Sequence, residues 1–204
     1  MLCLSVMAYE LPNPLIGETT PPRAVEVAKL WVSQFLKRGG VAVDATVGLG
    51  RDCEFLASLV GPTGRVYAFD VQSEAIRISK QRLVEKELDS IVQFFNESHT
   101  EIERIREPIN AAMFNLGYLP HNKSGPKTSP PDSIDAIRSC CTRLVVGGIV
   151  TIVVYAGHEG GENETTAVIK FIEQLCPEEF QTSRFCYQGS LGHPPQVLGI
   201  VRIA

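Results

Sequence analysis

The stretch Val41-Ala42-Val43-Asp44-Ala45-Thr46-Val47-Gly48-Leu49-Gly50-Arg51-Asp52 organises the rest of the chain. Its first residues, 41–45, are mostly β-branched or apolar and predict a buried strand. Gly48 and Gly50 let the backbone turn tightly and approach a ligand without a Cβ in the way. From Asp52 onward the apolar residues have helical spacing. A strand, a glycine turn and a helix together point backbone N–H groups and a helix N-terminus toward an anionic ligand group.

An acidic residue follows this turn at the distance expected for a nucleoside cofactor. Residues 65–70 predict a second strand that ends in Asp70, and an acid about 20 residues after the glycines can accept hydrogen bonds from both ribose hydroxyls. Taken alone, Asp70 could also be an acid that follows a strand and contacts no ligand. The dinucleotide fingerprint is incomplete, because Cys53 stands where its third glycine belongs. The combined pattern therefore favours S-adenosylmethionine over NAD, with its methionine end over residues 48–50 and its ribose on Asp70.

Length and composition predict a single domain with a full core, because the chain has 204 residues of which 44% are hydrophobic. A net charge of −4 argues against a protein that coats long stretches of phosphate, but a local cationic patch could still bind RNA. The 6 cysteines include no C-x-x-C pair, so we expect mostly small buried residues in a reducing cytoplasm and no zinc site. Residues 1–8 lack the features of a signal peptide, and no membrane span is predicted.

Strands and helices alternate along the chain, with residues 1–21 as an irregular lead-in and residues 22–204 as one domain. Helices are predicted over residues 22–37, 52–59, 73–86, 134–144 and 168–175, and strands over residues 41–45, 65–70, 91–95, 109–115, 149–155, 182–187 and 197–203. Gly147-Gly148 is expected to end the helix before the strand that starts at residue 149. The two consecutive strands at the end imply a hairpin and an antiparallel edge. The expected fold is thus a Rossmann-like α/β fold whose seven-stranded sheet is mostly parallel, with an antiparallel last strand and helices on both faces.

The ends of the five expected parallel strands are all polar or contain glycine. They are residues 44–50, 70–72, 96–99, 115–118 and 155–158. Ligands of open α/β sheets bind beyond the carboxyl ends of the strands. A binding site is therefore expected along this edge.

Five motifs, in this order, resemble those of a known family. They are Asp44-Ala45-Thr46-x-Gly48-x-Gly50-x-Asp52, Phe69-Asp70-x-Gln72, Ser98-His99, Phe114-Asn115-Leu116-Gly117-Tyr118-Leu119-Pro120 and Val154-Tyr155-x-Gly157-His158-x-Gly160-Gly161-x-x-Glu164. Together they are similar to the small bacterial class I methyltransferases long labelled rRNA methylases. Members of that family methylate the aminomethyl group of 5-aminomethyl-2-thiouridine at the tRNA wobble position. The chain departs from the family at Leu49, where Asn is frequent, and at Arg51, where a small polar residue or His is frequent.

The resemblance implies S-adenosylmethionine as the cofactor and tRNA, or another RNA, as the partner. The implied cofactor-binding residues are Asp44, Gly48, Leu49, Gly50, Asp70, Gln72, Ser98 and His99. Gln72, Ser98 and His99 would line the adenine side, although His99 could also be a loop histidine that does not contact the cofactor.

The segment Asn115-Leu116-Gly117-Tyr118 also resembles the Asn-Pro-Pro-Tyr segment of amino-directed N-methyltransferases. The carbonyl of Asn115 and a backbone carbonyl can accept the N–H hydrogens of an amine and so direct its lone pair at the methyl group. Tyr118 could stack on the target base or pack in the core. His158 could take the proton that an alkylamine must lose, a role that water could also fill. The expected catalytic residues are therefore Asn115, Tyr118 and His158.

Substrate contacts are expected from Tyr155 and from the long loop of residues 117–131. Lys123 and Lys127, together with His121, make that loop cationic, which suits either phosphate contact or a solvated loop.

The leading hypothesis is a cytoplasmic tRNA wobble-uridine N-methyltransferase without a metal, for which a homodimer stays open. The alternatives are an rRNA or small-molecule methyltransferase, an NAD-dependent oxidoreductase and a catalytically silent protein that binds S-adenosylmethionine.

Overall fold

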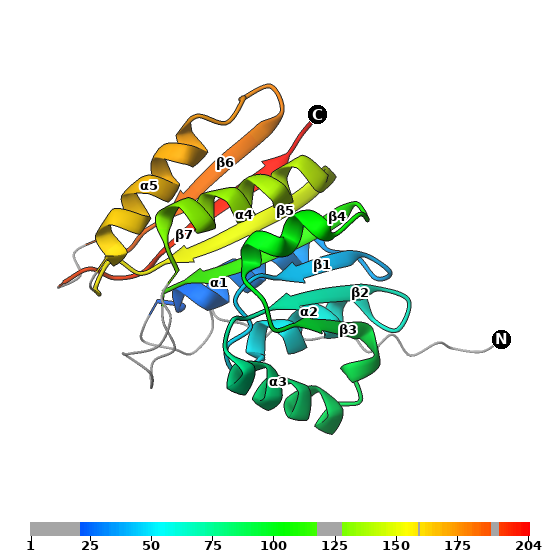
Figure 1. Ribbon diagram of the computed structural model, residues 1–204. Coiled ribbons are helices and arrows are strands. Elements are labelled where there is room, and N and C mark those ends of the chain that lie inside the picture. Colours follow the sequence, from blue (N-terminus) through cyan, green and yellow to red (C-terminus); the bar gives the residue numbers. More distant parts are fainter. Residues whose placement is uncertain (1–20, 118–127, 159, 189–191) are drawn as a thin grey trace.

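A seven-stranded β-sheet lies between two layers of helices in the computed structural model (Figure 1). The structure describes residues 21–117, 128–158, 160–188 and 192–204. The strands are β1 (Val41–Asp44), β2 (Arg65–Phe69), β3 (Val92–Phe95), β4 (Ile109–Leu116), β5 (Leu144–Val154), β6 (Phe180–Phe185) and β7 (Gln196–Arg202). The α-helices are α1 (Ala24–Phe35), α2 (Arg51–Val60), α3 (Ser73–Glu85), α4 (Pro130–Arg143) and α5 (Gly161–Glu173), and two short 3₁₀ helices are η1 (Asp89–Ile91) and η2 (His99–Arg104). None of the helices in these described ranges is long and apolar enough to cross a membrane.

The strand order is β3-β2-β1-β4-β5-β7-β6. The pairs β1–β2, β1–β4, β2–β3 and β4–β5 are parallel, whereas β7 is antiparallel to both β5 and β6. The predicted fold, a mostly parallel sheet with an antiparallel last strand, is confirmed. The expected hairpin and antiparallel edge are also confirmed, because β6 and β7 form an antiparallel pair at this edge of the sheet, with β6 outermost. The burial of the two strands fits this order, since the apolar β7 is largely buried and the polar β6 is largely exposed.

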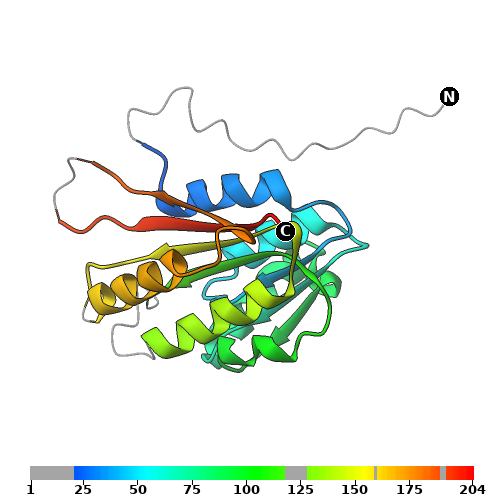
Figure 2. The same cartoon turned by 90° about the horizontal axis from the view of Figure 1, so that it is seen from above.

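The two faces of the sheet carry separate apolar cores. Helices α1, α2 and α3 cover one core, and η2, α4 and α5 cover the other. Figure 2 shows α1 on one side of the sheet and α4 and α5 on the opposite side. The long parallel strands are therefore buried on both faces, which explains their continuous apolar sequences. On the first face, the indole of Trp31 lies against Gly199, where a Cβ would come within 2.9 Å of the indole Cζ3.

The start of β5 differs from the sequence prediction. Helix α4 ends at Arg143, and Leu144 already has extended backbone angles and pairs with Ile109. The register then shifts, so that Ala111 pairs with Ile149. Gly147, with φ of 79°, lies in this irregularity. The two glycines therefore form a bulge inside the strand and do not end the helix.

The described cysteines fall into two groups. Cys53, Cys140 and Cys141 are buried, as expected, whereas Cys176 and Cys186 are exposed. Burial raises the pKa of the Cys53, Cys140 and Cys141 thiols, so these three side chains act as small apolar residues.

Candidate functional site

The carboxyl ends of β1 and β4 form the centre of the candidate site. β1 pairs with β2 on one side and with β4 on the other, so the chain crosses over in opposite directions from this strand. Such a switch point leaves a crevice beyond the strand ends, where ligands of open α/β sheets bind. The glycine turn, Asp70 and Asn115 all lie at or next to these strand ends.

The glycine turn is fixed by the acid at the end of β2. One oxygen of Asp70 accepts a hydrogen bond of 2.8 Å from the Gly48 N–H, and the other accepts one of 2.9 Å from the Gln72 N–H. Burial raises the pKa of the Asp70 carboxyl, and these two N–H groups partly oppose the rise. The carboxylate keeps further lone pairs for a ligand. The sequence-predicted group of Gly48, Asp70 and Gln72 is thus brought together.

The rest of the turn packs against α3. Gly50 has φ of 74°, and a Cβ there would lie 2.7 Å from the hydroxyl of Ser79. The Leu49 carbonyl accepts a hydrogen bond of 3.0 Å from Arg82 Nε. Gly50 is therefore required for the turn and its contact with α3, in addition to any approach by a ligand.

Asp44 is a buried carboxyl with an unused acceptor. Its Oδ1 accepts from the Thr46 N–H at 3.1 Å, while its Oδ2 is buried and has no hydrogen-bond partner among the described residues. Burial, followed by the negative charge of Asp52, raises the pKa of Asp44 well above the ordinary value. A ligand that brings an N–H donor or a positive charge would satisfy this oxygen.

Asn115 has a second unused acceptor in the same crevice. Its backbone N–H donates to Thr46 Oγ1 at 2.7 Å, and its side-chain Nδ2 donates to Asp52 Oδ2. Asp52, in the first turn of α2, forms an ion pair of 2.8 Å with Lys29 Nζ from α1. Asn115 Oδ1 is buried without a hydrogen-bond partner among the described residues. The amide carbonyl is therefore free to accept from a ligand.

Tyr155 and His158 lie beside the end of β4. A Cβ built on Gly117 would lie 3.6 Å from Nε2 of His158 and 3.7 Å from Cδ2 of Tyr155. Tyr155 is half-buried, and burial followed by the charge of Asp52 raises the pKa of its phenol. The sequence-predicted residues Tyr155 and His158 thus lie beside Gly117, two residues after Asn115.

Ser98 and His99 have structural partners of their own. Ser98 caps η2 by accepting a hydrogen bond from the Thr100 N–H at 3.2 Å. His99 is only 8% exposed, lies edge-on to Phe114 and forms a hydrogen bond with the Ala45 backbone. Burial lowers the pKa of His99, so the neutral ring is favoured. A cofactor contact from either residue stays a prediction.

Three other predicted site residues, Tyr118, Lys123 and Lys127, lie outside the described residues, as does His121.

Sequence reasoning missed the roles of Thr46, Asp52 and Lys29. Thr46 and Asp52 belong to the glycine-turn motif, so an acid in the first turn of the helix was an available signal. Lys29 precedes that motif in a separate helix, and nothing in its sequence neighbourhood links it to the site.

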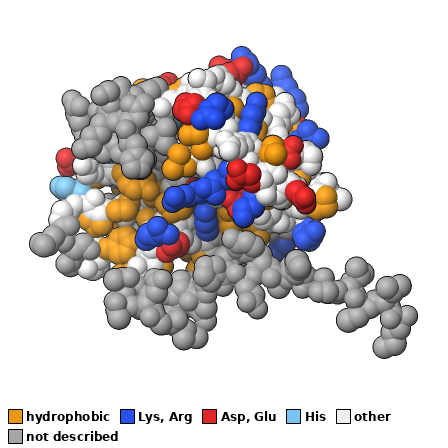
Figure 3. All heavy atoms as spheres, turned by 90° about the horizontal axis from the view of Figure 1, so that it is seen from below, with side chains coloured by type: hydrophobic (Ala, Val, Ile, Leu, Met, Phe, Trp, Pro, Cys, Tyr) orange, Lys and Arg blue, Asp and Glu red, His pale blue; other side chains and the backbone are white. Residues whose placement is uncertain are grey.

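Charges around the site are mostly paired. Arg77 pairs with Glu74 at 2.7 Å on α3, and Arg82 pairs with Glu54 of α2 at 2.8 Å. Figure 3 shows the same mixture across one face of the molecule, where Lys and Arg side chains alternate with Asp and Glu. Among the described residues no group of His, Cys, Asp and Glu is arranged to hold a metal ion.

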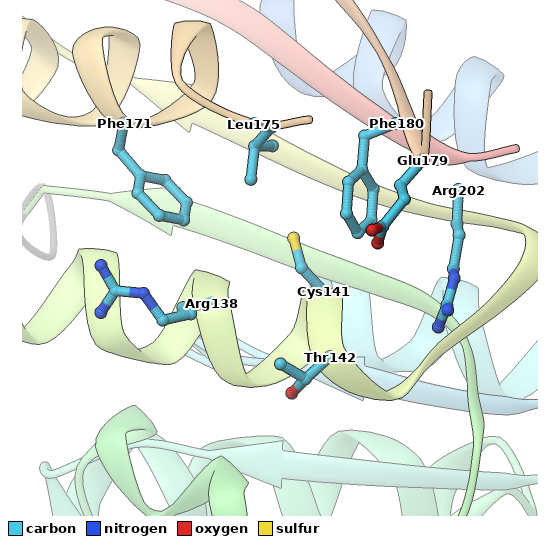
Figure 4. A pocket seen from close by; sticks show the side chains of 8 residues that line it. All are labelled: Arg138, Cys141, Thr142, Phe171, Leu175, Glu179, Phe180 and Arg202. Carbon is cyan, nitrogen blue, oxygen red and sulfur yellow. The ribbon is translucent and has the colours of Figure 1, made fainter. Parts of the chain in front are cut away.

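Two hollows lie away from this crevice. One, of about 350 Å³, lies between the C-terminal ends of α4 and α5 and the last two strands (Figure 4). Its lining includes Arg138, whose guanidinium lies over the Phe171 ring. The other, of about 270 Å³, lies under η2 beside β2 and β3. Neither contains a residue predicted for the site.

The comparisons with known proteins agree with this arrangement. Residues 66–201 match the model of a family described as "Putative rRNA methylase". A plant relative, the chloroplastic tRNA (mnm(5)s(2)U34)-methyltransferase of Arabidopsis thaliana, is 34% identical in an alignment of 162 residues that covers 73% of this chain. The match spans 58% of the plant protein, so the plant protein is considerably longer.

Two solved structures are similar over nearly the whole fold. The "putative rRNA-methylase" of Clostridium thermocellum has a TM-score of 0.87 and 34% identity, covering 90% of this chain and 100% of that one. A "putative methyltransferase" of Streptococcus mutans, in complex with SAH, has a TM-score of 0.81 and 33% identity, covering 90% of this chain and 99% of that one.

Proposed function

The chain belongs to the family described as "Putative rRNA methylase", and from this membership we propose that it is an S-adenosylmethionine-dependent methyltransferase. We further propose that it methylates the aminomethyl nitrogen of 5-aminomethyl-2-thiouridine at position 34 of tRNA. The plant relative carries the name of a methyltransferase for that nucleoside, and the Streptococcus mutans neighbour was solved with SAH.

The residues of the crevice fit this cofactor. Asp70 would hold the ribose hydroxyls and Gln72 would line the adenine side. The glycine turn at Gly48 would lie under the methionine end, and the buried Asp44 would face the positive charge of that end. The buried Oδ2 of Asp44, which lacks a hydrogen-bond partner among the described residues, supports this fit, because a cation or an N–H donor would satisfy it. When bound, S-adenosylmethionine supplies a methyl group on a positively charged sulfur, which a neutral amine can accept with the loss of one proton.

Asn115 would orient the amine. Its buried Oδ1 accepts one N–H of the substrate nitrogen and so points the nitrogen lone pair along one direction. This free carbonyl oxygen beside the glycine turn is the observation that carries the proposal.

His158 and Tyr155 would complete the acceptor side. His158, whose ring lies beside Gly117, would take up the proton that the alkylamine loses. Tyr155, half-buried and close to Gly117, would offer a ring against which the base can pack.

Incubation with labelled S-adenosylmethionine and aminomethyl-bearing tRNA, followed by nucleoside mass analysis, tests the proposal. A labelled methyl group on the wobble nucleoside is the expected result, and Asn115→Ala should abolish it while the protein stays folded. Cofactor binding without label on that nucleoside would refute the tRNA assignment.

An rRNA methyltransferase is the second candidate. A 48-residue segment is 44% identical to the ribosomal RNA small subunit methyltransferase H of Acidobacterium capsulatum, covering 24% of this chain. Label on rRNA and none on tRNA in the same experiment would favour it.

We also propose a cytoplasmic location and assembly as a homodimer. The exposed thiols of Cys176 and Cys186 suit a reducing compartment. Light scattering on the purified protein tests the dimer, and fractionation of cells tests the location.

A further inference from the structure

We propose that Asp52 is a positioning residue that sets the orientation of the Asn115 amide, and that Lys29 holds the Asp52 carboxylate in the position that does so. The inference deepens the proposed function, because Asn115 acts there through its carbonyl oxygen. Asp52 and Lys29 have no direct part in the methyl transfer.

The Asn115 amide needs an external group to fix it. A rotation of 180° about the last side-chain bond exchanges the carbonyl oxygen and the NH₂ group of an asparagine, which have nearly the same shape. Only one orientation presents an acceptor to a substrate amine, since the other presents N–H donors to N–H donors. A catalyst that depends on this carbonyl therefore loses efficiency if the two orientations interchange.

Asp52 fixes the productive orientation. Its Oδ2 accepts a hydrogen bond from Asn115 Nδ2. An ionised carboxylate has acceptors and no donor, so it binds the NH₂ group and rejects the carbonyl. Asn115 Oδ1 is then directed away from Asp52, and this oxygen is buried without a hydrogen-bond partner among the described residues.

Lys29 anchors the Asp52 carboxylate. The Asp52 side chain is only 8% exposed, and Lys29 Nζ lies 2.8 Å from its Oδ1. Because Lys29 holds Oδ1, the other oxygen, Oδ2, stays directed at Asn115 Nδ2. The other ionisable groups near Asp52 are Asp44 from β1, the neighbouring thiol of Cys53 and the phenol of Tyr155 after β5. None of these three is a cation, so within the described residues the ion pair of Asp52 is the one with Lys29.

Nuclear magnetic resonance of the Asn115 side chain tests the orientation without any substrate. In ¹⁵N-labelled protein, the Nδ2 resonances, identified by their loss in Asn115→Ala, should be protected from hydrogen exchange in the wild type. Asp52→Asn should shift these resonances and reduce the protection. Asp135→Asn is the matched control, because Asp135 lies on α4 with its side chain 65% exposed and paired with Arg138, and it should leave them unchanged.

Turnover on aminomethyl-bearing tRNA gives the second readout. Asp52→Asn should lower kcat by about 100-fold, the size expected when a reacting group is misplaced. The KM for tRNA and the Kd for SAH should change by less than about threefold, because neither ligand depends on the amide orientation in the ground state.

Lys29→Met separates an anchoring role from a merely structural one. Without the ion pair the Asp52 carboxylate can turn away from Asn115, so Lys29→Met should lower kcat and shift the Asn115 resonances as Asp52→Asn does, with the KM for tRNA changed by less than about threefold. Lys170→Met, at an exposed position of α5, should leave kcat and the Asn115 resonances unchanged.

The outcomes separate the two proposals. Methyl transfer by the wild type, with an unchanged kcat and unshifted Asn115 resonances in Asp52→Asn, would overturn the positioning role. A wild type that methylates no tRNA amine would overturn the proposed function, and the resonance measurements would then decide the positioning role alone. If Asp52→Asn does not fold, the kcat and the Asn115 resonances of Lys29→Met decide it.

Discussion

Replacing Glu164 with alanine should cost about 3–4 kcal/mol of unfolding free energy, because this carboxylate ties together the starts of two helices. Glu164 lies in the first turn of α5 and is 3% exposed. It accepts a hydrogen bond of 2.7 Å from the hydroxyl of Ser133 in α4, and one of 2.8 Å from the hydroxyl of Thr128 just before α4. The carboxylate therefore holds the N-terminal ends of α4 and α5 beside each other.

The magnitude follows from these two contacts. A hydrogen bond to a charged group contributes about 1.5–3 kcal/mol, and the substitution leaves two hydroxyls without their acceptor. Ser133 is fully buried, so its hydroxyl would be left without any acceptor and would carry the full desolvation penalty. Thr128 is partly exposed, so water can replace part of the hydrogen bond that its hydroxyl loses. Two such bonds would contribute about 3–6 kcal/mol, so the expected loss of about 3–4 kcal/mol lies in the lower half of that range.

Thermal unfolding measures the effect. For a chain of this size about 1 kcal/mol corresponds to a shift in Tm of 2–4 °C, so the Tm of Glu164→Ala should fall by about 6–16 °C. Glu162→Ala is the matched control, since Glu162 is exposed in the same turn, and it should change stability by less than about 0.5 kcal/mol. In Ser133→Ala, the further loss caused by Glu164→Ala should be smaller, because the two residues share one bond. A Tm for Glu164→Ala equal to that of Glu162→Ala would refute the reasoning.

Three further predictions concern other parts of the fold. Burial and the charge of Asp52 raise the pKa of Asp44 above its unfolded value, so the stability contributed by the protonated acid is lost as the pH rises. Asp44→Asn, which resembles that acid, should therefore match the wild-type Tm under acidic conditions and exceed it under alkaline conditions in thermal melts. Gly199→Ala should cost about 1–3 kcal/mol in urea unfolding, because its Cβ would meet the indole of Trp31. Burial and the hydrogen bond to Glu107 raise the pKa of Tyr67 to about 12, and Glu107→Gln should lower this pKa in an ultraviolet titration of the phenol.

The sequence was sufficient to predict the fold and the edge of the sheet that carries the candidate site. The alternation of apolar strands and amphipathic helices is a local property, and the polar residues that follow each strand mark the carboxyl edge of the sheet. The pair Gly147-Gly148 is a position where the local sequence does not determine the structure. A glycine pair after a helix is compatible with a helix stop and with a strand bulge, and the pairing of Leu144 with Ile109 decides between them.

The contacts within the candidate site depend on the order of the strands in the sheet. That order cannot be inferred from short stretches of the sequence. Asn115 is 63 residues from Asp52 and 69 residues from Thr46, yet it bonds to both because β4 lies next to β1. Spacing rules predict partners within one turn of a helix or along one strand, and they cannot predict partners across a crossover. Asp70 was accessible to such a rule because the distance between the glycine turn and the next strand end is nearly constant in this class of fold.

The same argument explains why an acidic group behind Asn115 was missed. Asp52 reads in the sequence as an acid in the first turn of a helix, which is favourable for the helix alone. In the structure that position faces the end of the neighbouring strand β4, and Lys29 from a third element pairs with its charge. An acid that only favours the first turn of a helix and an acid that positions another side chain look the same in the sequence. Only the neighbour across the sheet distinguishes them. In the positioning role proposed for it, the Asp52 carboxylate, held by Lys29, determines which atom of Asn115 a substrate amine would meet.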